Sequence, residues 1–155
     1  SSASRSLLYD LLSDLPPGAC ERITFEILES EKIRDFNEMV DFLNEIRKFG
    51  VKIAIDDFGA GYSSLGLVQM LNADVIKIDR SFVLRDLPGQ RAQTVLGNII
   101  RMALELEMSV ICEGIETAEQ AAILMRLGCF KAQGYYYARP EPEHEFEARL
   151  AMLVT

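Results

Sequence analysis

The sequence has little of what several common kinds of site require. Its 155 residues include one histidine and three cysteines, and the cysteines form no CxxC pair. A zinc site of the ordinary type needs more such ligands, so the composition argues against one. We expect Cys20, Cys112 and Cys129 to be reduced and mostly buried, as in a cytoplasmic protein.

Long apolar runs and an excess of positive charge are also missing. No run approaches the roughly 18 apolar residues of a membrane span, and no secretory signal opens the sequence. The formal net charge of −8 argues against a nucleic-acid duplex as a partner. We expect a cytoplasmic protein, or the cytoplasmic part of a larger sensor, with no membrane contact from this segment.

The apolar content is high enough for a core. Hydrophobic residues make up 49% and charged residues 26% of the chain, which suits one globular domain. The single histidine, His144, stands in an acidic run from 141 to 147. We expect it to be a surface residue rather than a catalytic base.

Hydrophobic periodicity switches repeatedly between strand and helix patterns. Strands are expected over about 22–28, 51–55, 73–78, 109–112 and 130–136. Helices are expected over about 33–50, 63–70, 89–106, 117–128 and 142–153. Strands separated by helices predict right-handed βαβ units, and hence an α/β fold with a parallel sheet.

Polar residues gather where the predicted strands end. Asp56 and Asp57 follow the second strand, and Gly59 and Gly61 come directly after them. Adjacent side chains that leave a strand point in different directions, so the two acids can face two neighbouring ions. A lone Asp-Asp pair is more often part of a turn or a helix cap, but here further charged and polar residues occur near the ends of the predicted strands. These residues are Glu26, Glu29, Lys77, Asp79, Glu113, Glu116 and Gln133.

Carboxylates in this pattern favour a hard divalent ion such as Mg²⁺ or Mn²⁺. Two such ions ~3.5–4 Å apart would activate a water and stabilise a phosphoryl oxygen. Lys77 would supply positive charge to the phosphorus or orient the water; alternatively, it forms an ion pair with Asp79 or Asp56 that only holds loops together. Glu113, which precedes Gly114, would be a metal ligand or a general base.

Four motifs resemble those of the EAL family, and they occur in the family's order. They are Ile53-Ala-Ile-Asp-Asp-Phe-Gly-Ala-Gly-Tyr-Ser-Ser-Leu, Val75-Ile-Lys-Ile-Asp-Arg-Ser-Phe-Val, Cys112-Glu-Gly-Ile-Glu-Thr and Gln133-Gly-Tyr. Phe25-Glu-Ile-Leu-Glu-Ser resembles the family's Glu-x-Thr-Glu motif. The resemblance implies a phosphodiesterase that hydrolyses cyclic di-GMP to linear pGpG on a TIM-type barrel, with residues 1–155 forming part of the domain.

The resemblance also implies a role for each matched residue. The metal ligands would be Glu26, Asp56, Asp57 and Glu113, with Asp56 bridging two Mg²⁺ or Mn²⁺ ions. The catalytic residues would be Glu113 and Lys77, and Glu29 would anchor the loop that follows Asp57. Substrate would be bound by Asp79, Glu116, Gln133 and Tyr135. Ca²⁺ should inhibit, because its longer and looser coordination fits a two-ion site poorly.

The sequence departs from the family's pattern at several points. Leu28 replaces a threonine, and Cys112 replaces a common alanine. The Glu-Ala-Leu strand that names the family is absent, and the family's asparagine ligand falls near Ser1. A TIM barrel has eight strands in about 250 residues, whereas about five strands are expected here. A longer polypeptide or a partner chain would then complete the barrel, and a stable open sheet is the least favoured case. We expect the isolated chain to be unable to assemble the full metal shell.

Two functions of different classes follow from these features. The first is a cyclic di-GMP phosphodiesterase in bacterial second-messenger signalling. The alternative is a catalytically silent module that binds cyclic di-GMP or another protein, and metal-dependent turnover separates the two. An unrelated metal phosphohydrolase rests on generic acid clusters alone. By resemblance, pairing into a homodimer is also expected.

Overall fold

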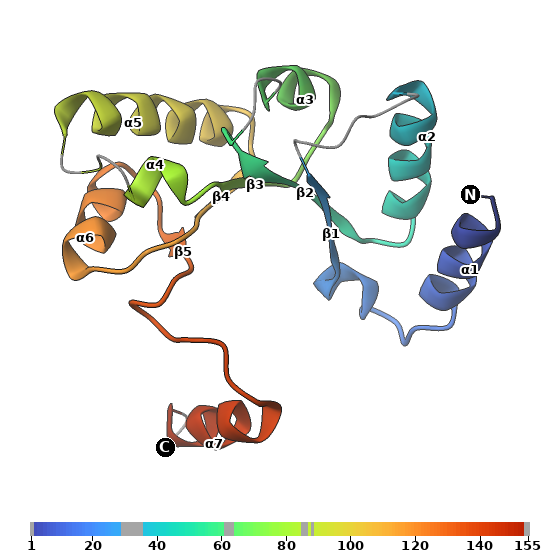
Figure 1. The fold of residues 1–155 in the computed structure, drawn as a ribbon. Helices are drawn as coiled ribbons and strands as arrows, with labels where there is room; N and C mark the ends of the chain where they lie inside the picture. The colour runs from blue at the N-terminus through green and yellow to red at the C-terminus, as the bar shows by residue number, and fades with distance from the viewer. Residues whose placement is uncertain (1, 29–35, 61–63, 85–86, 88, 154–155) are drawn as a thin grey trace.

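The computed structural model describes residues 2–28, 36–60, 64–84, 87 and 89–153, which form an α/β structure (Figure 1). The strands are β1 (Thr24–Leu28), β2 (Lys52–Phe58), β3 (Val75–Ile78), β4 (Ser109–Cys112) and β5 (Lys131–Ala132). The helices are α1 (Ser2–Ser13), the 3₁₀ helix η1 (Cys20–Arg22), α2 (Phe36–Arg47), α3 (Ser64–Met70), α4 (Ser81–Leu84), α5 (Gln90–Glu105), α6 (Ala118–Arg126) and α7 (Glu143–Leu153). The strands are all parallel and lie in the order β1-β2-β3-β4-β5. The predicted parallel sheet is confirmed.

The two faces of the sheet have different neighbours. Helices α2, α3 and α5 lie on one side of it, while α7 lies apart at the end of an extended segment (Figure 1). On β3, Ile76 and Ile78 are fully buried in the core, and Lys77 between them points to the opposite face because side chains alternate along a strand. The core therefore lies between sheet and helices, and the other face is available to polar residues.

Two strands differ in length from the sequence-based expectation. β2 continues to Phe58, so Asp56 and Asp57 lie within it rather than after it. β5 covers only Lys131–Ala132, because the chain turns at Gly134 and the Tyr137 amide bonds to the Gly134 carbonyl. The short helix α4 and the N-terminal helix α1 were not expected from periodicity. The predicted helix starts at 33–35 and at 63 lie outside the described residues.

Helix α6 begins as the sequence predicts. The Thr117 hydroxyl accepts a hydrogen bond from the Gln120 amide, and the Gln120 side chain accepts one from the Thr117 amide in return. This reciprocal arrangement satisfies two amides that a helix start leaves unpaired. The chain leaves the helix at Gly128, whose φ of 91° suits glycine.

The structure also tests the expected burial of the cysteines and the expected exposure of the single histidine. Cys20, Cys112 and Cys129 are free thiols and are buried, as predicted. His144 is at the start of α7 with its side chain 80% exposed, which confirms its surface position. In the part of the chain that the structure describes, no helix has the length and apolar character needed to cross a membrane.

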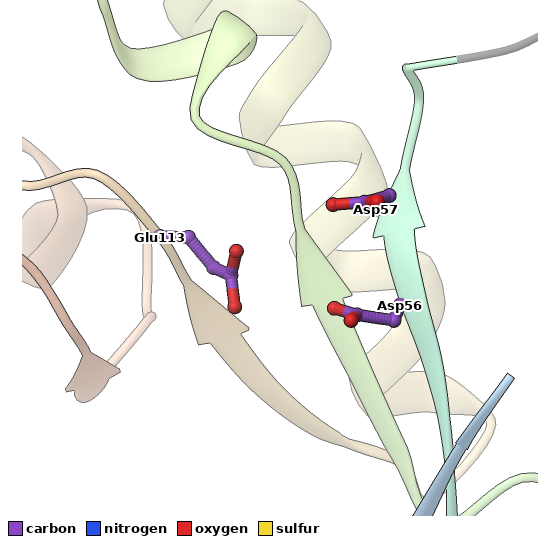
Figure 2. A group of neighbouring side chains, drawn as sticks. All are labelled: Asp56, Asp57 and Glu113. Carbon is purple, nitrogen blue, oxygen red and sulfur yellow. The ribbon is translucent and has the colours of Figure 1, made fainter. Parts of the chain in front are cut away.

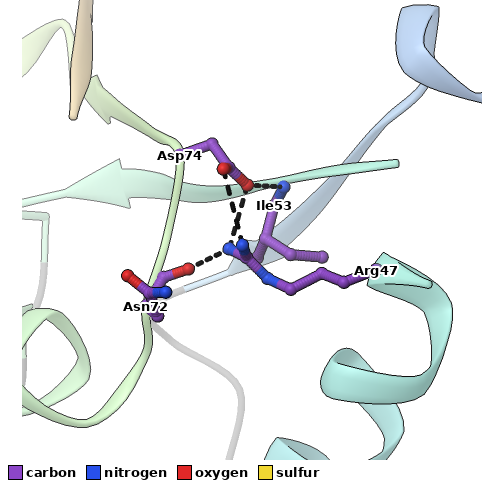
Figure 3. Close-up of polar contacts among 4 residues, drawn as sticks. All are labelled: Arg47, Ile53, Asn72 and Asp74. Carbon is purple, nitrogen blue, oxygen red and sulfur yellow. Dashed lines mark hydrogen bonds and ion pairs between the residues drawn. The ribbon is translucent and has the colours of Figure 1, made fainter. Parts of the chain in front are cut away.

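The amino ends of β2 and β3 are joined by a polar network around Asp74 (Figure 3). The Asp74 carboxylate accepts a hydrogen bond from the Ile53 amide at 2.7 Å and pairs with the Arg47 guanidinium at 2.9 Å. The same guanidinium donates to the Asn72 carbonyl. Because Ile53 is only 1% exposed, water cannot readily replace Asp74 as the partner of its amide.

We expect Asp74→Ala to lower the free energy of unfolding by about 2 kcal/mol, because it removes a charge-assisted hydrogen bond to a buried amide. Arg47→Ala should cost about 1 kcal/mol, since this ion pair is partly exposed. Urea unfolding monitored by circular dichroism would measure both. As a control, Arg5→Ala removes a more exposed ion pair, with Glu38. Equal losses for Asp74→Ala and Arg5→Ala would contradict the role given to Asp74.

Candidate functional site

Three carboxylates meet at the carboxyl ends of β2 and β4 (Figure 2). Asp56 and Asp57 extend from β2 toward Glu113, which directly follows β4. One carboxylate oxygen from each residue lies within 4.8 Å of the other two. The carboxyl ends of parallel strands are where α/β folds place their sites. The structure thus brings together three of the four predicted metal ligands.

An irregularity in β2 brings the two adjacent aspartates to the same side. The pairing of β2 with β3 shifts between Ile55 and Phe58, and Asp57 has a left-handed backbone with φ of 53°. In a regular strand, consecutive side chains point to opposite faces. The sequence-based expectation that the two acids diverge is therefore wrong for this strand. Aspartate tolerates the left-handed conformation better than most residues do.

Lys77 on β3 lies at the centre of the acids. Its Nζ is 2.8 Å from Asp56 Oδ1, 2.9 Å from Glu26 Oε1 and 2.9 Å from Glu113 Oε1. Glu26 on β1, the fourth predicted metal ligand, thus reaches the cluster through Lys77. Of the two ion pairs left open from sequence, the one with Asp56 is present, and two further acids join it.

Burial and charge shift the pKa values of two groups in the cluster. Burial alone would lower the pKa of Lys77, but its close contacts with Asp56, Glu26 and Glu113 raise the pKa above its usual range. Burial, followed by the nearby charges of Asp56 and Asp79, raises the pKa of Asp57. The site therefore holds one firmly protonated cation among acids that repel one another.

Gln133 holds Glu113 from the other side. Its side-chain amide donates to Glu113 Oε1 at 2.7 Å. Its own backbone amide donates to the Cys112 carbonyl at 2.9 Å, which aligns the end of β5 with β4. The Glu113 amide in turn donates to the Ile78 carbonyl on β3. Glu113 is thus fixed both through its backbone and through two side-chain contacts.

A pocket of 450 Å³ opens beside Glu113. Its lining includes the predicted residues Glu116, Gln133 and Tyr135, together with Arg80 and Arg139. The Arg139 guanidinium lies over the Tyr135 ring at 4.5 Å, a cation–π contact. A larger hollow of 760 Å³ over α5 and α6 has none of the predicted site residues in its lining.

The two pocket arginines were missed in the sequence analysis. Arg80 directly follows Asp79 after β3. The search for polar residues at strand ends favoured acids, and it would have included Arg80 if cations had been given the same weight. Arg139 lies beyond the last strand, and its contact with Tyr135 depends on the turn at Gly134. No sequence spacing indicated that contact.

Asp79, another predicted residue, is not one of the three clustered carboxylates. Asp79 accepts a hydrogen bond from the Ser81 amide at 2.9 Å and so caps the start of α4. It acts on the acids by charge, since it contributes to the raised pKa of Asp57. Glu29, the predicted loop anchor, lies outside the described residues.

The acid cluster has the chemistry of a divalent-cation site. Asp56 Oδ1 is buried and accepts no hydrogen bond of ordinary geometry within the described chain; the Lys77 ammonium is the cation that faces it. All the oxygen donors are carboxylates, which Mg²⁺ and Mn²⁺ prefer. Asp56, Asp57 and Glu113 are the residues placed to hold such an ion, and Glu26 is a further acid that contacts Lys77 beside them.

Comparison with curated proteins gives two named cyclic di-GMP phosphodiesterases of Pseudomonas aeruginosa. The chain is 39% identical to RocR over 132 residues, which is 85% of this chain and 33% of RocR. It is 39% identical to NbdA over 121 residues, which is 77% of this chain and 15% of NbdA. The chain therefore spans a third or less of the length of these relatives.

Solved structures also superpose on this chain. An EAL domain protein from Listeria monocytogenes superposes with a TM-score of 0.87 at 30% identity, over 98% of this chain and 60% of that one. A manganese and cyclic di-GMP complex of BlrP1 from Klebsiella pneumoniae superposes with a TM-score of 0.76 at 35% identity, over 87% of this chain and 34% of that one. The family model of the EAL domain matches residues 3–140. This chain belongs to the EAL domain family, and its βα units are those of a TIM-type barrel.

Proposed function

We propose that this chain forms part of a phosphodiesterase that hydrolyses cyclic di-GMP to linear pGpG with Mg²⁺ or Mn²⁺. The observation that carries the proposal is the cluster of Asp56, Asp57 and Glu113 around Lys77. Relatives also support the proposal. Two of them are named cyclic di-GMP phosphodiesterases, and one solved neighbour is a complex with manganese and cyclic di-GMP.

In the proposed reaction, the oxygen of a water molecule attacks phosphorus and the bond to the 3′ oxygen breaks. The 3′ oxygen takes up a proton and leaves as a hydroxyl, and the phosphate stays on the 5′ oxygen of pGpG. Bound divalent ions would lower the pKa of the water and neutralise phosphoryl charge. Glu113, oriented by Gln133, would accept the proton of the water. Lys77 would donate hydrogen bonds to the phosphodiester.

The other predicted residues have proposed roles in metal binding, in anchoring a loop and in substrate binding. Glu26 and Asp57 would complete the acid shell, and Glu29 would anchor the loop after Asp57. Substrate contacts are proposed for Glu116, Gln133 and Tyr135, which line the pocket beside Glu113, and for Asp79, which is at the end of β3. The cytoplasmic location, a homodimer, and completion of the barrel by another chain stay predictions.

The alternative is a silent receptor for cyclic di-GMP. The observation in its favour is that Lys77 already pairs with three of the acids that metal ions would use. Incubation of the chain with cyclic di-GMP and Mn²⁺, followed by anion-exchange chromatography, separates the two functions. Appearance of pGpG, lost with EDTA, supports the enzyme and overturns our expectation that the isolated chain is incomplete. Binding without product, in this chain and in longer forms of the protein, supports the receptor.

We further expect Ca²⁺ to inhibit turnover supported by Mn²⁺. Ca²⁺ takes about six to eight oxygen ligands at ~2.3–2.6 Å, whereas Mg²⁺ requires a near-octahedral shell at ~2.0–2.1 Å. The longer and looser coordination of Ca²⁺ would fit a two-ion site of carboxylates poorly. Initial rates at fixed Mn²⁺ and rising Ca²⁺ would measure the effect, with added K⁺ as the ionic-strength control. Stimulation by Ca²⁺ would contradict this prediction.

A further inference from the structure

The contacts of Lys77 are unusual for a lysine whose role is to bind substrate. An ammonium group has three hydrogens to donate, and Lys77 Nζ has three carboxylate oxygens from three different strands or strand ends within 2.9 Å. The side chain is only 12% exposed. In this arrangement the ammonium is surrounded by three acids, and its charge is balanced by them rather than by a phosphodiester.

We propose that Lys77 is the resident counter-ion of the metal-free site and competes with divalent cations for the same carboxylates. The inference rests on the proposed function, because it assumes that Asp56, Glu113 and Glu26 bind the metal. It assigns Lys77 a positioning role toward the metal, distinct from its proposed contact with the phosphodiester.

The physical basis is the repulsion between two cations, the Lys77 ammonium and the divalent ion, that contact the same carboxylate oxygens. A cation bound to Asp56 Oδ1 would lie close to an ammonium 2.8 Å from the same oxygen. Water screens the two positive charges poorly here, because the side chains of Asp56 and Lys77 are both largely buried. Metal binding must therefore weaken or break the ion pairs of Lys77.

This exchange links metal loading to substrate binding. Once its ion pairs are broken, the ammonium of Lys77 is free to donate to the phosphodiester. Each ligand then strengthens the other, because coupling between two binding sites is reciprocal. The competing explanation is that Lys77 only ties β1, β2 and β4 to β3; it predicts a loss of stability on mutation but no gain in metal affinity.

Calorimetric titration of Mn²⁺ into the metal-free protein tests the proposal. Lys77→Met should bind Mn²⁺ at least about tenfold more tightly than the wild type, because one positive charge beside the site is gone. Lys77→Arg, which keeps the charge, should not bind more tightly than the wild type. Lys52→Met is the matched control: Lys52 is on the same face of β2 as Asp56, four residues away, and its loss should change affinity less than threefold. Asp56→Asn should weaken binding.

A second measurement uses the unaltered protein and covers the case in which Lys77→Met does not fold. The ammonium group of Lys77, observed by ¹⁵N-resolved NMR, should give a slowly exchanging signal without metal, because it is buried in three ion pairs. That signal should shift or disappear as Mg²⁺ is added. An unchanged Lys77 signal at saturating Mg²⁺ would overturn the proposal.

The outcomes separate this inference from the function on which it rests. Mn²⁺ binding by the wild type with equal or weaker binding by folded Lys77→Met overturns the counter-ion role and leaves the phosphodiesterase proposal standing. No Mn²⁺ binding by either protein, in this chain and in longer forms of the protein, overturns both. Tighter binding by Lys77→Met without any hydrolysis by the wild type supports the counter-ion role and favours the receptor.

Discussion

Glu113→Gln should lower the turnover of cyclic di-GMP at least about a hundredfold, in whichever length of the protein first shows hydrolysis. The substitution keeps the size of the side chain and leaves an oxygen that can accept the Gln133 hydrogen bond. It removes the negative charge and the ability to accept a proton. Nucleotide binding should stay within about tenfold of the wild type, because Glu113 is one of several residues that line the pocket and the substitution hardly alters the pocket's shape.

The measurement is product formation by chromatography alongside calorimetric binding of cyclic di-GMP. Glu119→Gln provides the matched control, since it makes the same chemical change at an exposed position in the first turn of α6. Its activity should equal that of the wild type. An activity near wild type for Glu113→Gln would remove Glu113 from the roles of base and ligand.

Gly134→Ala should lower the free energy of unfolding by about 3 kcal/mol, at the upper end of overpacking effects. A methyl group at this position would lie 2.2 Å from both the amide nitrogen and the carbonyl oxygen of Ile115. These are backbone atoms of a fully buried residue, so they cannot turn aside. The Ile115 amide also donates to the Gln133 carbonyl and its carbonyl accepts from the Tyr136 amide, and both bonds would be strained.

Gly66→Ala is the control for this substitution. Gly66 is in α3, and a methyl group there would meet nothing within 4 Å. The better helix propensity of alanine should raise stability by about 0.5–1 kcal/mol. Urea unfolding of the three proteins would give the comparison. Similar stability for Gly134→Ala and Gly66→Ala would show that the segment after β5 is not packed against Ile115 as described.

Sequence periodicity predicted the order of strands and helices because both patterns are local. Alternation within β3 already separates Lys77 from its apolar neighbours, and the Thr117-to-Gln120 box marks the start of α6. The acids could be placed at one edge of the sheet because parallel strands share that edge. Most of the fold and the composition of the site therefore follow from short-range rules.

What could not be predicted depends on pairing between strands. The shifted register that turns Asp57 beside Asp56 exists only when β2 meets β3. The contact of Arg139 with Tyr135 needs the turn at Gly134. Helix α4 has only four residues, too few for a 3.6-residue period to be detected. The register shift depends on contacts between strands, the arginine–tyrosine contact depends on a turn, and α4 is too short to give a periodic signal, so sequence spacing indicates none of the three.

Strand β3 combines two tasks in four consecutive residues. Ile76 and Ile78 have no exposed surface, and the ammonium group between them lies within reach of three acids. Selection for a tighter core and selection for a functional charge therefore act on one short length of backbone. Variants that repack the helices against Ile76 or Ile78 would move the ammonium as well. In directed evolution, heat resistance and ion affinity should change together at these positions, and improving one trait alone would require substitutions elsewhere.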